Sequence, residues 1–122
     1  YTGIMHYLKE KNPDIKGVLA DPVGSIIGGG TEHKDYNIEG VGNDFIPDTM
    51  DTSLIDICIK VNDEQAFSTA KEITRREGVI AGSSSGADLW CALELAKRID
   101  KGNIVVLFPD RGDRYISKGL YD

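Results

Sequence analysis

The chain has 122 residues, of which 40% are hydrophobic and 28% charged, and its formal net charge is −6. That length and composition indicate one globular domain with a real core. The acidic balance, with no apolar run long enough for a membrane span and no signal peptide, argues against nucleic acid and membrane as partners.

The first residues predict a helix followed by a buried strand. A modest helical stripe ends before Pro13, because proline disfavours the helical conformation in the residue that precedes it. The apolar run over residues 15–22 then closes on Asp21-Pro22, which predicts a buried strand and a turn. The expected inward face of the helix contains Ile4, Tyr7, Leu8 and Lys11.

Residues 22–53 are rich in glycine and show no helical or strand period. A loop of this length inside one domain is usually functional or disordered. Its apolar residues indicate that it packs onto the core, so we expect an ordered loop that lines a site. These residues are Ile26, Ile27, Ile38, Val41, Phe45 and Ile46.

A strand and a helix follow the loop. Over residues 53–61 the apolar side chains alternate with polar ones, which predicts a strand with one buried face. Asn62 and Gln65 have the spacing of a capping box, and Gly78 marks the end of the helix. The inward stripe of this helix is expected to contain Ala66, Phe67, Ala70, Ile73 and Thr74.

The last third of the sequence predicts a very short strand at residues 79–82. A helix follows over about 85–100, which Gly102 ends, and then a strand over 104–108. The last run is continuously apolar, as in strands buried on both faces of a parallel sheet. The helix is expected to turn Leu89, Ala92, Leu93, Ala96 and Ile99 inward. This order of elements predicts an α/β fold with three layers, a mainly parallel sheet and flanking helices, as a single domain over residues 1–122.

The segment VIAGSSSGADLW, residues 79–90, fits the G-x-S-x-G pattern of hydrolases around Ser84. A nucleophilic serine there needs a histidine that follows it in the chain, and both His6 and His33 precede it. Two other interpretations stay open. The serines could form a cradle for an anion or ligand at a helix N-terminus, or Ser84 or Ser85 could simply cap the helix, which composition alone favours.

Other candidate residues carry weaker signals. His33 lies near Glu32 and Asp35, but the spacing is too loose for a metal site, and we expect a solvated loop face without metal. Asp110 follows the last predicted strand, at the edge where α/β proteins place ligands, although it could also be an ordinary turn residue. The two cysteines, Cys58 and Cys91, fit no disulfide framework or zinc site, which favours reduced thiols and a cytoplasmic location.

Four segments together resemble a known family. EGVGNDFIPDTMD, NDEQAF, EGVIAGSSSGA and VLFPDRGDRYISK, which begin at residues 39, 62, 77 and 106, occur in this order and spacing. They are similar to the C-terminal half of the cysteine synthase and cystathionine β-synthase family, pyridoxal-phosphate enzymes of fold type II. The similarity runs from Thr2 to Asp122, and the first and last segments favour the cystathionine β-synthase-like branch.

The resemblance implies roles for four residues. Ser84 matches the serine that hydrogen-bonds the pyridine nitrogen of the cofactor, and a neutral hydroxyl there is expected to leave that nitrogen largely unprotonated. Gly40 and Gly42 match a glycine loop beside the cofactor and substrate. Asp110 matches a residue near the pyridine end. Ser84, Gly40, Gly42 and Asp110 are therefore the expected cofactor-binding residues.

Two positions depart from the family pattern. Asn43 replaces a tyrosine that the cystathionine-forming branch usually carries, which puts cystathionine formation in doubt. Arg111 adds a cation where relatives read Pro-Asp-Ser-Gly, and it either shapes the substrate entrance or lies on the surface.

The resemblance implies an enzyme that makes cysteine or cystathionine from serine or an activated serine and a thiol or sulfide, a lyase or transferase that is a homodimer. The family's covalently bound lysine and phosphate loop lie upstream of the matching region, so no residue here is expected to be catalytic. We expect the chain to be the C-terminal portion of the catalytic core, with a regulatory domain after Asp122 possible. Alone it should bind the cofactor poorly and show no turnover, which visible absorbance tests.

A competing interpretation is a non-catalytic, truncated homologue that acts as a binding or interaction module. The sequence upstream of Tyr1 discriminates between the two.

Overall fold

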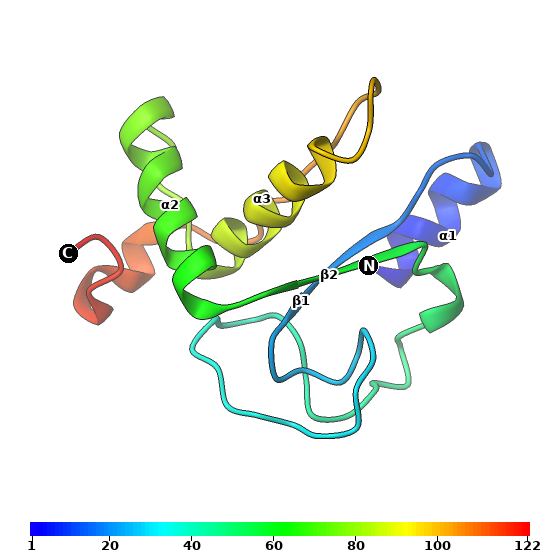
Figure 1. The fold of residues 1–122 in the computed structure, drawn as a ribbon, viewed down its shortest axis with the longest axis horizontal. Helices are drawn as coiled ribbons and strands as arrows, with labels where there is room; N and C mark the ends of the chain where they lie inside the picture. The colour runs from blue at the N-terminus through cyan, green and yellow to red at the C-terminus, as the bar shows by residue number, and fades with distance from the viewer.

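The computed structural model describes residues 1–122, and a two-stranded parallel sheet runs through the middle of the molecule (Figure 1). Strand β1 spans Val18–Pro22 and strand β2 spans Ile57–Val61, with Val18 opposite Ile57 and Pro22 opposite Val61. The alternation predicted for β2 is confirmed, because Ile59 and Val61 are buried and Lys60 is exposed.

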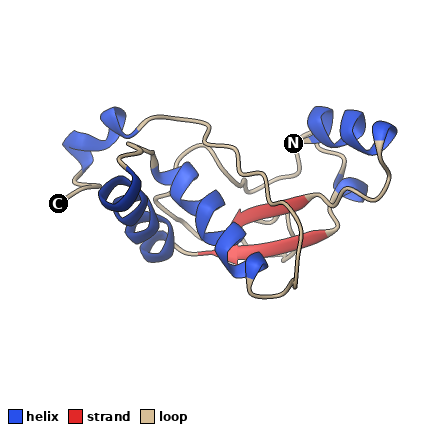
Figure 2. Cartoon of the chain, turned by 90° about the horizontal axis from the view of Figure 1, so that it is seen from above, coloured by secondary structure: helices blue, strands red, loops and turns tan.

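Helices lie at both ends of the sheet (Figures 1 and 2). Helix α1, Thr2–Lys11, lies at one end together with the short 3-10 helix η1, Thr52–Leu54, which replaces the start of the predicted second strand. Helix α2, Asp63–Glu77, lies at the other end, where its Ala70 packs with Tyr115 of the 3-10 helix η2, Gly112–Lys118. Helix α3, Ser83–Ala96, packs against α2 and extends over the sheet, where it contacts both strands (Figure 2). The structure confirms the parallel-sheet α/β class.

Helix α2 begins and ends as its sequence predicts. The Asn62 side chain accepts a hydrogen bond from the Gln65 backbone N–H, and the Gln65 side chain accepts one from the Asn62 backbone N–H, both at 2.9 Å. Gly78 closes the helix in the left-handed conformation, with φ of 70°. The capping box therefore satisfies two backbone donors that the helix itself leaves free.

Replacing Asn62 by alanine should lower the free energy of unfolding by about 1 kcal/mol, because the first turn of α2 then loses its side-chain acceptor. Denaturant unfolding of the full-length protein measures the change. Asn103→Ala, at an exposed position outside the helices, serves as the matched control and should shift stability by less than about 0.5 kcal/mol. Equal effects of the two variants would contradict the assigned cap.

The main core lies between β2, α2, α3 and the long loop. Ile38 contributes to it from the loop, so the predicted packing of that segment onto the core is confirmed, although Phe45 and Ile46 are exposed. The core consists of Ile38, Ile59, Val61, Ala66, Ala87, Cys91 and Leu95.

The predicted inward faces of two helices are wrong. Helix α1 buries Met5, while Ile4 and Tyr7 are exposed. Helix α3 starts at Ser83 and ends at Ala96, before Gly102; Leu93 is exposed on it, and Ile99 lies beyond its end and is exposed as well. Its buried residues are instead the small residues from Ser83 to Ala87 at its start, followed along the helix by Cys91 and Leu95. Small side chains let the backbones of α2 and α3 approach closely, and this contact sets the rotation of α3.

The last two predicted strands are also wrong for this chain. Residues 79–82 form only an isolated antiparallel bridge between Ala81 and Arg111. Residues 104–108 have no strand structure, and Val105 is 95% exposed. A buried parallel strand needs neighbouring strands on its flanks, and no other segment of these 122 residues pairs with this one.

Candidate functional site

The three serines of the G-x-S-x-G segment form the first turn of α3. Gly82 is the N-cap and makes no side-chain cap, while Ser83, Ser84 and Ser85 are helical and at most 2% exposed. The cap interpretation is therefore wrong, because the serine hydroxyls do not satisfy the backbone donors of their own helix. They hydrogen-bond to two other segments of the chain.

Asp110 is the centre of the first set of contacts. The Ser84 hydroxyl donates to Asp110 Oδ1 at 3.1 Å, and the Ser85 hydroxyl donates to the Asp110 carbonyl at 3.2 Å. The Tyr115 hydroxyl donates to Asp110 Oδ2. A Cβ atom on Gly82 would lie 2.1 Å from Asp110 Oδ1. Glycine at this position is therefore what lets the carboxylate lie against the start of α3.

The glycine loop meets the same turn from the other side. The Glu39 backbone N–H donates to the Ser83 hydroxyl at 3.3 Å, which places Gly40 next to the serine turn. Gly40 and Gly42 have φ of 79° and 72°, a conformation that side chains rarely adopt. Gly42 is also packed tightly, since a Cβ there would lie 2.8 Å from the Ser25 Cβ atom.

Ser25 fixes the far end of this loop. Its hydroxyl accepts a hydrogen bond from the Asn43 backbone N–H at 3.0 Å, and Ile26 donates its N–H to the Asn43 carbonyl at 3.0 Å. The Asn43 side chain accepts from the Asp44 N–H, so it stabilises the turn. Arg111, the second departure, is exposed and pairs with Asp113 at 3.3 Å, which places it on the surface.

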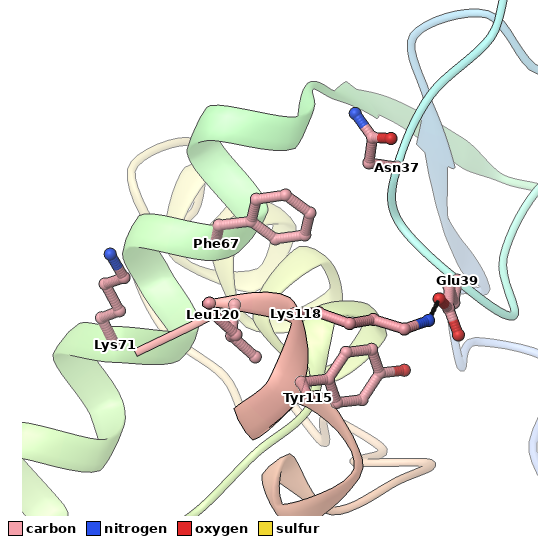
Figure 3. Close-up of a pocket in the computed structure, with 8 residues that line it drawn as sticks. Asn37, Glu39, Phe67, Lys71, Tyr115, Lys118 and Leu120 are labelled. Carbon is pink, nitrogen blue, oxygen red and sulfur yellow. Dashed lines mark hydrogen bonds and ion pairs between the residues drawn. The ribbon is translucent and has the colours of Figure 1, made fainter. Parts of the chain in front are cut away.

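A cavity of about 380 Å³ lies beside this network (Figure 3). The Lys118 side chain extends to Glu39 and forms an ion pair with it, with its ammonium 5.9 Å from the centre of the Tyr115 ring. The C-terminal segment is thereby connected to the glycine loop. The cavity is lined by Asn37, Glu39, Phe67, Lys71, Tyr115, Lys118, Gly119 and Leu120.

The sequence patterns did not single out Tyr115, Lys118 or Asp88 as residues of the site. Tyr115 and Lys118 belong to a polar tail whose contacts join segments far apart in the chain, and no local pattern signals such contacts. Asp88 carried a detectable signal, because it is a carboxylate one helical turn after Ser84 in an otherwise apolar stretch. Burial raises the pKa of the Asp88 carboxyl to about 7, and the negative charge of Asp110 makes a smaller contribution in the same direction.

The raised pKa of Asp88 predicts a pH-dependent stability. The folded state binds a proton at Asp88 that the unfolded state has already released, so stability falls as pH rises from about 4 to about 7. Asp88→Asn should remove this loss and be more stable than the unaltered protein at about pH 8, by about 1 kcal/mol or more. Unfolding curves at several pH values measure the effect, and the exposed Asp100→Asn is the control. A stability difference independent of pH would contradict the assignment.

The structure does not support the hydrolase interpretation. His6 pairs with Asp51 at 3.4 Å and His33 lies 3.5 Å from Asp35, and neither is a partner of Ser84. No group of three or more histidine, cysteine or acidic side chains is arranged to bind a metal ion. None of the helices combines the length and the apolar character that crossing a membrane requires.

Comparisons with known proteins extend over the whole chain. The O-acetylserine dependent cystathionine beta-synthase of Bacillus subtilis is 51% identical over all of this chain, which covers 40% of that protein. The cysteine synthase of Helicobacter pylori is 40% identical over 99% of the chain, again covering 40% of its length. The crystal structure of the O-acetylserine dependent cystathionine beta-synthase from Helicobacter pylori matches with a TM-score of 0.91 at 40% identity, over 99% of this chain and 40% of that one.

These relatives confirm the resemblance predicted from the four segments, and the solved structure confirms a fold shared with enzymes of fold type II. The chain spans about 40% of the length of these relatives. The sequence profile of the family described as pyridoxal-phosphate dependent enzyme matches residues 1–110. The chain belongs to this family of pyridoxal-phosphate dependent enzymes.

Proposed function

We propose that this chain forms the ring-nitrogen side of the cofactor site in an enzyme that makes cysteine or cystathionine. The observation that carries the proposal is the convergence on one serine turn of the segments that resemble the family. Ser84 contacts Asp110, which is 26 positions away, and Ser83 contacts Glu39, which is 44 positions away. The predicted cofactor residues Ser84, Gly40 and Asp110 are thereby brought together, with Gly42 following in the same loop.

The residues present fit pyridoxal phosphate. Ser84 offers a neutral hydroxyl at a buried helix start, where a ring nitrogen can be held by one hydrogen bond. Asp110 fixes the orientation of that hydroxyl. Gly40 and Gly42 give the loop a backbone conformation without side chains, so it can approach a flat ligand closely. When bound, pyridoxal phosphate supplies an electron sink for bond breaking next to the amino-acid Cα.

The proposed substrates are a serine derivative and a sulfur nucleophile. Two of the relatives are O-acetylserine dependent cystathionine beta-synthases, which supports O-acetylserine as the activated serine. The sulfur nucleophile is a thiol or sulfide, giving cystathionine or cysteine. The unpaired cysteines Cys58 and Cys91 support a reducing, cytoplasmic compartment. The homodimer implied by the resemblance stays a prediction.

The test uses the full-length protein with pyridoxal phosphate. We expect a visible absorption band that shifts when O-acetylserine is added, and mass spectrometry should then detect cystathionine with homocysteine or cysteine with sulfide. Ser84→Ala should weaken cofactor binding about tenfold, the effect of one lost hydrogen bond of about 1.4 kcal/mol. The exposed Ser117→Ala should leave binding unchanged. A protein that develops no absorption band with excess cofactor would contradict the proposal and favour a non-catalytic module.

A further inference from the structure

The Lys60 ammonium has more partners than a simple ion pair. A lysine ammonium carries three N–H donors. It lies 2.5 Å from Asp21 Oδ2, and it donates to the backbone carbonyls of Ser25 and Gly29 at 2.9 and 3.3 Å. All three donors are therefore used, and two of them hold the backbone of the long loop. Lys60 in β2 lies directly opposite Asp21 in β1, so the pairing of the strands sets where the ammonium lies.

Ser25 extends these contacts to the glycine loop. Its hydroxyl accepts the Asn43 backbone N–H, and the Asn43 carbonyl accepts the N–H of Ile26, the residue after Ser25. Gly42 packs against the same serine, since a Cβ atom added to Gly42 would lie 2.8 Å from the Ser25 Cβ atom. The placement of Gly42 and Asn43 therefore depends on the placement of Ser25, whose carbonyl the ammonium holds.

We propose that Lys60 is a positioning residue for the glycine loop, a cation tethered to β2 that fixes Ser25 and thereby the loop at Gly42 and Asn43. The inference deepens the proposed function and rests on it, because that function places the loop beside the cofactor and substrate. When a ligand binds only the ordered form of a loop, its apparent affinity falls with the fraction of molecules that are ordered. Lys60 thus sets substrate affinity through the loop.

Two effects of Lys60 can be separated by mutation. Its charge compensates the Asp21 carboxylate, which is 1% exposed, and this effect concerns the stability of the whole domain. Its N–H groups bind the loop carbonyls, and this effect concerns the order of the loop. In the double variant Asp21→Asn with Lys60→Met, the buried charge is gone, and an amide oxygen can still accept the Gly28 N–H that Asp21 accepts at 2.9 Å. The loop carbonyls, however, still lack the ammonium.

The test is hydrogen exchange, read by mass spectrometry, on the full-length protein with pyridoxal phosphate bound. Peptides that cover residues 22–46 should exchange about tenfold faster in Lys60→Met and in the double variant, because the loop loses two hydrogen bonds to a charged group. In the double variant, peptides from α2 should exchange as in the unaltered protein. Lys97→Met, which removes an exposed ammonium paired with Glu94, should leave the loop unchanged.

Steady-state kinetics with O-acetylserine provide a second measurement on the same proteins. In the double variant KM should rise about threefold or more while kcat changes less than about twofold, since loop order affects binding more than chemistry. If Lys60 had only a structural role, neither constant would move in a folded double variant.

The outcomes separate this inference from the proposed function. Slow loop exchange or an unchanged KM in a folded double variant would overturn the inference, because the charge of Asp21 would then account for the role of Lys60. If neither variant folds, the inference is wrong as well, since Lys60 would then support the whole domain. An unaltered protein without cofactor absorbance or turnover would instead overturn the proposed function. The exchange rates would still decide whether Lys60 orders the loop.

Discussion

Replacing Gly86 by alanine is expected to lower the free energy of unfolding by about 3 kcal/mol or more, the upper range for overpacking a well-filled interior. Gly86 lies where α3 crosses α2. A Cβ atom there would lie 2.1 Å from the Ala66 carbonyl oxygen and 2.9 Å from the Ala70 Cβ atom. Because the nearest atom belongs to the backbone, the two helices must move apart. The serine turn sits at the start of α3 and would be displaced with it.

Gly3→Ala is the matched control for this prediction. Gly3 lies in α1, and a Cβ atom added there meets nothing within 4 Å. The control should be neutral or stabilising by up to about 1 kcal/mol, because alanine favours the helix. Denaturant unfolding of the full-length protein measures both variants. A Gly86→Ala protein as stable as the unaltered one would show that α2 and α3 do not approach as closely as described.

Replacing Lys60 by methionine should cost about 3 kcal/mol of stability, since it leaves a buried carboxylate without its cation. Asp21 is 1% exposed, and its Oδ2 atom lies 2.5 Å from the Lys60 ammonium, while its Oδ1 atom has no hydrogen-bond partner. The same ammonium donates to the carbonyls of Ser25 and Gly29 at 2.9 and 3.3 Å. Lys60 therefore holds the beginning of the long loop against the ends of both strands.

Two further variants make the Lys60 experiment specific. Lys97→Met breaks an exposed ion pair with Glu94 and should cost less than about 1 kcal/mol. Adding Asp21→Asn to Lys60→Met should recover part of the lost stability, because it removes the unpaired charge. If Lys60→Met and Lys97→Met had equal effects, Lys60 would have no special role in holding the loop. Loss of the Lys60 contacts should also loosen Ser25 and, through Asn43, the glycine loop.

The local signals in the sequence predicted the elements whose causes are local. The capping box at Asn62 and the alternation in β2 involve neighbours in the chain, and both are confirmed. The run over residues 104–108 was misassigned because its burial depends on neighbouring strands that this chain does not provide. The inward face of α3 was misassigned because its rotation depends on Gly86 meeting Ala66, a contact that hydrophobic periodicity does not report.

The candidate site could be predicted only through the combination of motifs. Composition alone suggested that the serines cap a helix, yet Gly82 is the cap and the hydroxyls bind other segments. The resemblance pointed to Ser84, Gly40 and Asp110, and in the structure Ser84 contacts Asp110 while the residue before Gly40 contacts Ser83. It gave no indication that Tyr115 donates to Asp110 or that Lys118 pairs with Glu39, because both contacts depend on how the C-terminal segment folds back.

The most direct test of the central claim is a crystal structure of the full-length protein with pyridoxal phosphate bound. The claim is that Ser84 meets the ring nitrogen of the cofactor with Asp110 behind it. The predicted result is a distance of about 3 Å between Ser84 Oγ and the ring nitrogen, with the Ser84–Asp110 hydrogen bond preserved. A ring nitrogen held by another side chain, with the serine turn remote from the cofactor, would contradict the account.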